Sequence, residues 1–246
     1  MEKNEYKKMF DSESSYWWYV GRRFIIREFL KKYFQKNDKP VLDVGCGTGV
    51  NLKLLEEFGS GVLGIDSSED ALNYCRSRGL NNVRMIEQGK ELAEPNSFHL
   101  VAMTDVLEHI ENEEAILRNV YSVLDSGGYL LVTVPAYQFM WSEHDVALHH
   151  FRRYTVGRLK KVLSDNGFKV LRASYIISFS FPLVLGYRII KGLINKIFTR
   201  EPKTSHVYLP PLLNNFFIWL LKIEGVVVRS INFPFGSSVI AIARKI

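Results

Sequence analysis

A glycine-rich turn that follows an acidic residue is the feature of this chain with the clearest chemistry. Residues 40–49 read PVLDVGCGTG, in which Asp43 stands two positions before Gly45. Gly45, Gly47 and Gly49 tolerate positive φ angles and leave space beside the main chain, so a ligand can approach the backbone closely. An apolar strand that opens through such glycines into a helix, here expected over residues 51–58, is typical of a nucleotide-type site.

A second carboxylate ends the next apolar segment. Residues 61–66 read GVLGID and predict a short strand with Asp66 at its end. The two oxygens of a carboxylate can accept hydrogen bonds from both hydroxyls of a vicinal diol. After a helix expected over residues 68–78, the segments VRMIE (83–87) and FHLVAMT (98–104) predict two further strands.

These segments, in this order, resemble the class I S-adenosylmethionine-dependent methyltransferase family. The matching stretches are VLDVGCGTG (41–49), GVLGID (61–66), VRMIEQGK (83–90) and FHLVAMTDVLEH (98–109). The resemblance implies S-adenosyl-L-methionine as cofactor and S-adenosyl-L-homocysteine as product. It implies cofactor contacts at Asp43, Gly45, Cys46, Gly47, Gly49, Asp66, Ser67, Gln88, Gly89, Met103 and Thr104. The chain departs from the family pattern at His99, where aspartate is usual, and at 88–90, where no acidic residue stands.

The order of elements predicts an α/β fold. Strands and helices alternate from residue 41 to residue 134, which favours a parallel sheet covered on both faces. A helix is expected over 112–124 and is expected to end at Asp125-Ser126-Gly127-Gly128. It is followed by a strand over 129–134, a helix over 155–166, and strands over 168–177 and 237–244. The family resemblance implies a seven-stranded, mostly parallel, Rossmann-like sheet, with the last strand antiparallel between the fifth and sixth.

Residues 178–236 separate the last two strands and are too many for an ordinary loop. We therefore expect a cofactor-binding methyltransferase domain over 1–177 and 237–246, interrupted by an apolar helical insertion. Its uncharged stretches 173–187 and 207–221 are short and contain prolines and an asparagine pair, so neither is predicted to span a membrane. Residues 188–203 predict a basic amphipathic helix. This insertion has three possible roles: a lid over the site, a homodimer contact, or a membrane-surface element formed by residues 178–221.

The N-terminal segment 16–19 (YWWY) places four aromatic residues before Arg22 and Arg23. Such a run needs apolar cover, and anchoring the first helix would provide it. Alternatively, the aromatic side chains cap the cofactor pocket, and Arg22 or Arg23 pairs with the methionine carboxylate of the cofactor, as guanidinium groups suit carboxylates.

The loop after the fifth strand is expected to bind the acceptor, because open α/β sheets bind ligands beyond the carboxyl ends of their strands. Tyr137, Trp141 and His149 are the candidate acceptor contacts, and His144 is the candidate general base, since histidine titrates near neutral pH. Zinc at His144, His149 and His150 is an alternative, but their spacing matches no known site, so no metal is expected. His109 is interpreted as structural.

Composition limits the remaining choices. The chain has 246 residues, a formal net charge of +6 and two cysteines, Cys46 and Cys75, so neither a disulfide framework nor a basic nucleic-acid arm is indicated. A cytoplasmic protein, peripheral to the inner face of a membrane if the insertion binds lipid, is expected, with no nucleic-acid partner. The preferred function is methyl transfer to an oxygen or nitrogen of a small or lipid-linked acceptor. A nicotinamide-dependent oxidoreductase, disfavoured by the G-x-G-x-G spacing, and a non-catalytic scaffold at a membrane are the alternatives.

Overall fold

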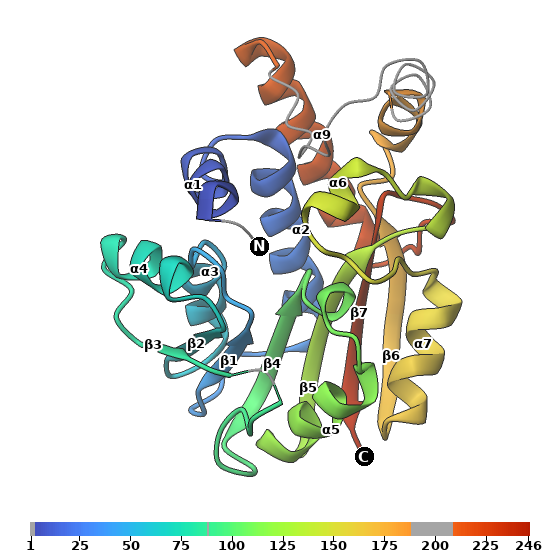
Figure 1. Ribbon diagram of the computed structural model, residues 1–246. Helices are drawn as coiled ribbons and strands as arrows, with labels where there is room; N and C mark the ends of the chain where they lie inside the picture. Colours follow the sequence, from blue (N-terminus) through green and yellow to red (C-terminus); the bar gives the residue numbers. More distant parts are fainter. Residues whose placement is uncertain (1–2, 88, 188–208) are drawn as a thin grey trace.

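A single seven-stranded sheet organises the chain (Figure 1). The computed structural model describes residues 3–87, 89–187 and 209–246. The strand order is β3-β2-β1-β4-β5-β7-β6; β7 is antiparallel to both of its neighbours, and the pairs among β1 to β5 are parallel. This arrangement confirms the predicted fold class. The strands are β1 (Val41–Val44), β2 (Val62–Asp66), β3 (Val83–Met85), β4 (Phe98–Thr104), β5 (Leu124–Pro135), β6 (Phe168–Ile176) and β7 (Ser238–Lys245).

Helices cover both faces of the sheet (Figure 1). Side-chain caps begin three of them: Ser68, Asn112 and Thr155 each accept a hydrogen bond from a backbone N–H of the first turn. The helices are α1 (Lys3–Ser12), α2 (Trp17–Tyr33), α3 (Leu52–Leu55), α4 (Glu69–Ser77), α5 (Glu113–Val123), α6 (Glu143–Ala147), α7 (Val156–Asp165) and α9 (Pro211–Val228), with 3₁₀ turns η1 (Glu56–Phe58), η2 (Leu107–His109) and η3 (Gln138–Met140).

Alternate residues of the central strands point to two apolar cores. On β4, Val101 and Met103 face the core shared with α5 and α7, whereas Leu100 and Ala102 face the core shared with α2 and α9. All four side chains are fully buried. The carboxyl ends of β1, β2 and β4 are thereby held on a rigid base, and the loops that follow them are positioned at one edge of the sheet.

The segment Asp125-Ser126-Gly127-Gly128 was expected to end a helix, and this expectation is wrong. Helix α5 ends at Val123, and Leu124 is already extended and starts β5. The pairing with β4 is irregular there, and Gly127 has a φ of 74° within the strand. Asp125 is held by His99, whose Nδ1 lies 2.9 Å from its carboxylate. The glycines therefore shape a bulge and not a helix terminus.

Helix α9 runs without interruption through a segment that was expected to be broken. Pro210 and Pro211 stand at its start, where a missing N–H costs no helical hydrogen bond. Asn214 lies inside the helix and bridges to the N-terminal segment, because its side chain accepts from the N–H of Trp17 at 2.9 Å and donates to the carbonyl of Ser15 at 3.0 Å. The prolines and asparagine thus fix the helix in place.

Helix α9 packs closely against α2, and one face of its C-terminal half is buried there, at Leu221, Glu224, Gly225 and Val228 (Figure 1). A Cβ at Gly21 would lie 2.3 Å from Leu221, and one at Gly225 would lie 2.9 Å from Phe24, so glycine is needed on both helices. Among the described residues, α9 is the one helix whose length and composition would allow it to cross a membrane, and 22% of it is buried. The expected amphipathic helix 188–203 falls outside the described residues.

Candidate active site

One cavity of about 1410 Å³ lies at the carboxyl ends of the parallel strands. Its walls come from the loops after β1, β2 and β4, from α1 and α2, and from the loop after β5. Ligand sites of drug-sized molecules usually occupy about 300–1,000 Å³. The cavity therefore has room for a nucleoside cofactor and an acceptor molecule together.

The glycine turn at this cavity requires glycine for steric reasons. Gly45, Gly47 and Gly49 have φ values of 68°, 56° and 86°. A Cβ at Gly45 would lie 2.5 Å from a methyl group of Val106, and one at Gly49 would lie 2.9 Å from the Sγ of Cys75. The turn is thus packed from behind, while Gly45, Cys46 and Gly47 present main chain to the cavity.

Asp66 ends β2 and connects that strand to the glycine turn. Its Oδ2 accepts a hydrogen bond from the N–H of Gly47 and its Oδ1 accepts one from the N–H of Ser68, both at 2.9 Å. Burial raises the pKa of this carboxyl, and the backbone hydrogen bonds oppose the rise. Because the side chain also lines the cavity, an anionic acceptor of hydrogen bonds stands ready at its wall.

Asp43 lies behind the turn and is fully buried. Neither of its carboxylate oxygens has a hydrogen-bond partner within the described part of the chain. Burial, and next the neighbouring Asp66, raise its pKa to about 8, against the opposing effect of Arg22. An unpartnered buried carboxylate is destabilising unless a positive group compensates it. With this raised pKa the Asp43 carboxyl is largely protonated near neutral pH in the ligand-free chain, which removes the cost of an unpaired buried charge.

The N-terminal arginines both reach the cavity but differ in their bonding. Arg22 forms an ion pair with Asp105 at 2.7 Å, donates to the hydroxyl of Thr133 and lies over the ring of Trp18. Its buried Nε has no hydrogen-bond partner among the described residues. Arg23 donates to the backbone carbonyl of Glu13 at 2.6 Å. Arg22 is therefore the better placed of the two to bind an anion.

Glu13 is a site residue that the sequence did not indicate. It lies between α1 and α2, is 1% exposed, and its carboxylate accepts from the hydroxyl of Thr48 and pairs with Arg78. Burial raises its pKa, and these hydrogen bonds oppose the rise. Through Thr48 the N-terminal segment is attached to the glycine turn, so α1 forms part of the cavity wall.

The cavity includes some of the expected cofactor residues and leaves others behind it. Gln88 lies outside the described residues. Asp43, Gly49 and Met103 do not line the cavity, and the side chains of Asp43 and Met103 are fully buried. Those that line it are Arg22, Gly45, Cys46, Gly47, Asp66, Ser67, Gly89 and Thr104.

The expected acceptor residues are divided in the same way. His144 on α6 and His149, which has a φ of 56°, both line the cavity. Tyr137 and Trp141 do not line it. The ring of Tyr137 instead stacks on Tyr175, with centroids 4.9 Å apart, and joins the loop to β6.

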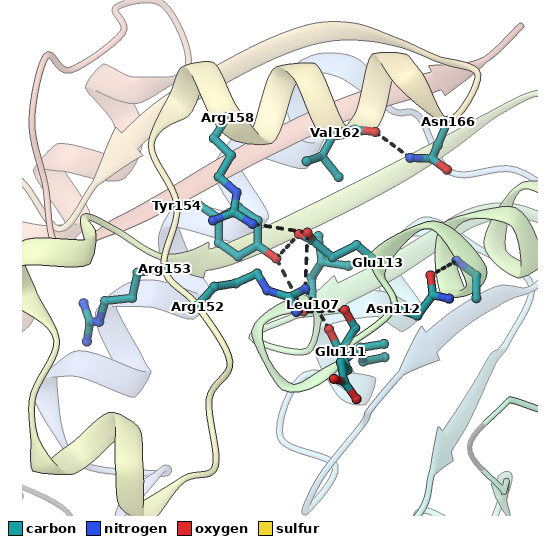
Figure 2. A network of polar contacts seen from close by, with 12 residues as sticks. Leu107, Glu111, Asn112, Glu113, Arg152, Arg153, Tyr154, Arg158, Val162 and Asn166 are labelled. Carbon is teal, nitrogen blue, oxygen red and sulfur yellow. Dashed lines mark hydrogen bonds and ion pairs between the residues drawn. The ribbon is translucent and has the colours of Figure 1, made fainter.

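A polar network fixes the acceptor loop against the turn after β4 (Figure 2). Tyr154, which is fully buried, donates its hydroxyl to Glu113 and to the carbonyl of Leu107. Arg152 and Arg158 pair with the same Glu113 carboxylate, at 3.2 and 3.3 Å. The two segments that form this side of the cavity are thus held together by charge and by hydrogen bonds.

Glu108, His109 and His150 also meet at this side of the cavity. Burial raises the pKa of Glu108 well above its usual value, and burial followed by the proximity of His150 lowers the pKa of His109 to about 3. The sequence interpretation had treated His109 as structural and had grouped His150 with other histidines. Residues 108–109 and 150 are brought together by the fold. In the sequence, the one indication of a site here was an acidic residue followed directly by a histidine after a strand.

Comparisons with known proteins agree with this geometry. A family model described as a methyltransferase domain matches residues 17–173. Phosphoethanolamine N-methyltransferase 1 of Triticum aestivum is 30% identical over 158 residues, which cover 58% of this chain and 30% of that protein. Ubiquinone biosynthesis O-methyltransferase of Aliivibrio fischeri is 26% identical over 138 residues, which cover 50% of this chain and 59% of that protein. The chain thus spans between about a third and three fifths of these two relatives.

A solved structure of similar fold is a S-adenosylmethionine-dependent methyltransferase from Archaeoglobus fulgidus. It has a TM-score of 0.59 and 20% identity, and the match covers 91% of this chain and 94% of that one. Fold and glycine-turn site together define a class I S-adenosylmethionine-dependent methyltransferase. The chain belongs to the methyltransferase domain family, and S-adenosyl-L-methionine is its cofactor.

The residues present fit this cofactor. The main chain of Gly45, Cys46 and Gly47 faces the cavity, and the two glycines carry no side chain there, so a ligand can approach the backbone closely. Asp66 offers carboxylate oxygens at the cavity wall, and Arg22 lines the same cavity with a guanidinium group suited to a carboxylate.

Proposed function

We propose that the protein transfers the methyl group of S-adenosyl-L-methionine to an oxygen or nitrogen atom of a small or lipid-linked acceptor. The observation that carries this proposal is the continuity of the cavity. The same cavity is lined by Gly45 and Asp66 of the cofactor region, by His144 of the acceptor loop, and by Leu183 and Phe217 at an apolar side. An amphiphilic acceptor is the class of molecule that matches such a mixed lining.

The cofactor supplies an activated methyl group when bound. The protein then has to hold the acceptor atom in line with that group and to exclude water. His144 is the proposed general base for an acceptor hydroxyl or ammonium, because it lines the same cavity as the residues of the cofactor region. A His144→Gln variant should lower kcat with little change in the affinity for S-adenosylhomocysteine; equal kcat across the pH range would remove this role.

The names of the relatives support both accepting atoms. One is an N-methyltransferase named for phosphoethanolamine and the other an O-methyltransferase named for ubiquinone biosynthesis. A polar headgroup and a polyisoprenoid-type molecule both belong to lipid chemistry. The acceptor loop of this chain favours neither atom, since imidazole can deprotonate a hydroxyl or an amine.

Contact with the cytoplasmic face of a membrane is the second part of the proposal. The N-terminal half of α9 exposes large apolar side chains, with Leu212 83%, Phe216 50% and Trp219 56% exposed. Leu183, which lines the apolar side of the cavity, is 64% exposed. The net charge of +6 favours an anionic surface. We propose that α9 lies on the lipid surface and does not cross it, because its C-terminal half packs against α2.

Two experiments test this function. Purified full-length chain and radiolabelled S-adenosylmethionine are incubated with a total lipid extract or with the aqueous metabolite fraction, and label is expected in the lipid phase. Co-sedimentation with anionic vesicles is expected to fall for Trp219→Glu and to persist for Met85→Glu, a change at an exposed apolar residue of β3. Label in the aqueous fraction alone would contradict a lipid acceptor, and equal sedimentation of both variants would contradict membrane contact through α9. If the chain forms dimers and Trp219→Glu dissociates them, α9 is instead a contact between subunits.

A further inference from the structure

Three potential metal ligands converge on the acceptor side of the cavity. Glu108 and His109 end the 3₁₀ turn η2 after β4, and His150 follows α6. Their ligand atoms all lie within 4.8 Å of one another. Three donors that each lie about 2.1 Å from one ion are at most about 4.2 Å apart. Small side-chain movements would therefore bring them around a single ion.

The carboxylate of Glu108 is the independent indication of a missing partner. It is 1% exposed, and neither oxygen accepts a hydrogen bond in the described part of the structure. The arginines whose charge acts on it are paired elsewhere, Arg22 with Asp105 and Arg153 with Asp145. A buried carboxylate in this position is stable when it is paired or when it coordinates a metal.

His150 has the hydrogen bonding that is common for a metal-binding histidine. Its Nδ1 lies 2.9 Å from the carboxylate of Asp145, which is fully buried. Arg153 donates to both oxygens of Asp145, at 2.7 and 3.1 Å, so this carboxylate is anionic and accepts the Nδ1–H of His150. The lone pair of His150 is then on Nε2, and a carboxylate that orients an imidazole in this way is a regular companion of metal sites.

The donors are held in place by contacts outside the cluster. The N–H of Phe151 donates to the carbonyl of Glu108 at 2.8 Å. Arg152 donates to the carbonyls of Ile110 and Glu111 at 2.9 and 2.8 Å, within the network of Figure 2. The backbone on each side of the cluster is therefore fixed to the other side without any ion, as expected of a prepared site.

We propose that Glu108, His109 and His150 bind one divalent transition-metal ion, with an open coordination position toward the cavity. Two imidazoles and one carboxylate suit Zn²⁺, Mn²⁺, Fe²⁺ or Co²⁺ better than Mg²⁺ or Ca²⁺, which prefer oxygen ligands. The open position would bind and orient an oxygen of the acceptor. That role rests on the proposed function, whereas ion binding itself does not.

Metal binding to the full chain tests the proposal. Protein stripped with EDTA is titrated with Zn²⁺ against a chromophoric chelator, and Co²⁺ is added in parallel to record its visible absorption. One tight equivalent per chain is expected, with tetrahedral or five-coordinate Co²⁺ bands. His150→Gln and Glu108→Gln are each expected to weaken Zn²⁺ binding at least tenfold, whereas His149→Gln, a change at the adjacent imidazole, leaves it as in the unsubstituted chain.

Several results would overturn the metal site. These are no stoichiometric Zn²⁺, equal affinity of all variants, or a loss as large for His149→Gln as for His150→Gln. Circular dichroism melts of the stripped variants show whether they are folded, and Glu108→Asp provides a carboxylate-retaining variant with intermediate affinity. Binding of S-adenosylhomocysteine is measured on the same samples to separate the two proposals. Loss of this binding with intact Zn²⁺ binding refutes the proposed function alone, whereas absent Zn²⁺ binding with intact S-adenosylhomocysteine binding refutes the metal site alone.

Discussion

Replacing the buried carboxylate of Asp43 with an amide should change how stability depends on pH. The pKa of Asp43 is about 8 in the folded chain, and that of an unfolded aspartate is about 4. Between these values the folded state binds more protons than the unfolded state, so the free energy of unfolding falls as pH rises. One group contributes at most about 1.4 kcal/mol per pH unit, or several kcal/mol across the window.

The measurement is urea unfolding of the cofactor-free chain at pH 5, 6, 7 and 8. For Asp43→Asn we expect a weaker decline with pH, by about 1 kcal/mol per unit. Glu13 and Glu224 also have raised pKa values, but neither acts on the pKa of Asp43, so their contributions cancel in the difference between the two proteins. Asp66 interacts with Asp43, so the difference in slope reports Asp43 together with its effect on Asp66. Asp165→Asn, on the exposed side of α7, is the control. Parallel curves for Asp43→Asn and the unsubstituted chain would refute the reasoning.

Three further changes test the cofactor region and the helix contact. Asp66→Asn should weaken binding of S-adenosylhomocysteine in calorimetry by about tenfold or more, since a charge-assisted hydrogen bond contributes about 1.5–3 kcal/mol; unchanged affinity would contradict its role. Arg22→Lys should weaken the same binding more than Arg23→Lys, and the reverse order would favour Arg23. Gly21→Ala should lower the free energy of unfolding, measured in urea, by about 1–3 kcal/mol, because the added Cβ overlaps with the Cβ and Cδ1 of Leu221; an unchanged free energy of unfolding would refute the contact.

Local patterns in the sequence were sufficient to predict the sheet and its cofactor edge. The parallel strands are mostly short apolar runs, capped helices follow β2 and β4, and Asp66 and the glycines owe their positions to strand ends and turn sterics. These are short-range constraints. The antiparallel position of the last strand came from the family resemblance, and the pairing of β7 with β5 and β6 confirms it.

The remaining features depend on contacts between distant segments. Asn214 is compatible with helix α9 because it hydrogen-bonds to Ser15 and Trp17, almost two hundred residues earlier. The glycine of the expected helix end, Gly127, is instead within β5, because Leu124 starts pairing with β4 before it. Neither outcome follows from composition or periodicity.

The acceptor side shows the same limit. His109 and His150 are brought to a ring-centroid distance of 4.5 Å by the packing of two loops. Their spacing along the chain matches no metal motif, and Tyr137, which was expected to contact the acceptor, packs on β6 instead of lining the cavity. Sequence reasoning found the loop that carries the chemistry but not which of its side chains face the cavity.

A crystal structure of the chain with S-adenosylhomocysteine is the most direct test of the central claim, that the glycine-turn cavity holds both cofactor and acceptor. We predict that the ligand lies in the cavity against Gly45 and Gly47, with its ribose at Asp66, and that open space remains between it and His144. A ligand bound elsewhere, or one that fills the cavity as far as His144, would contradict the account.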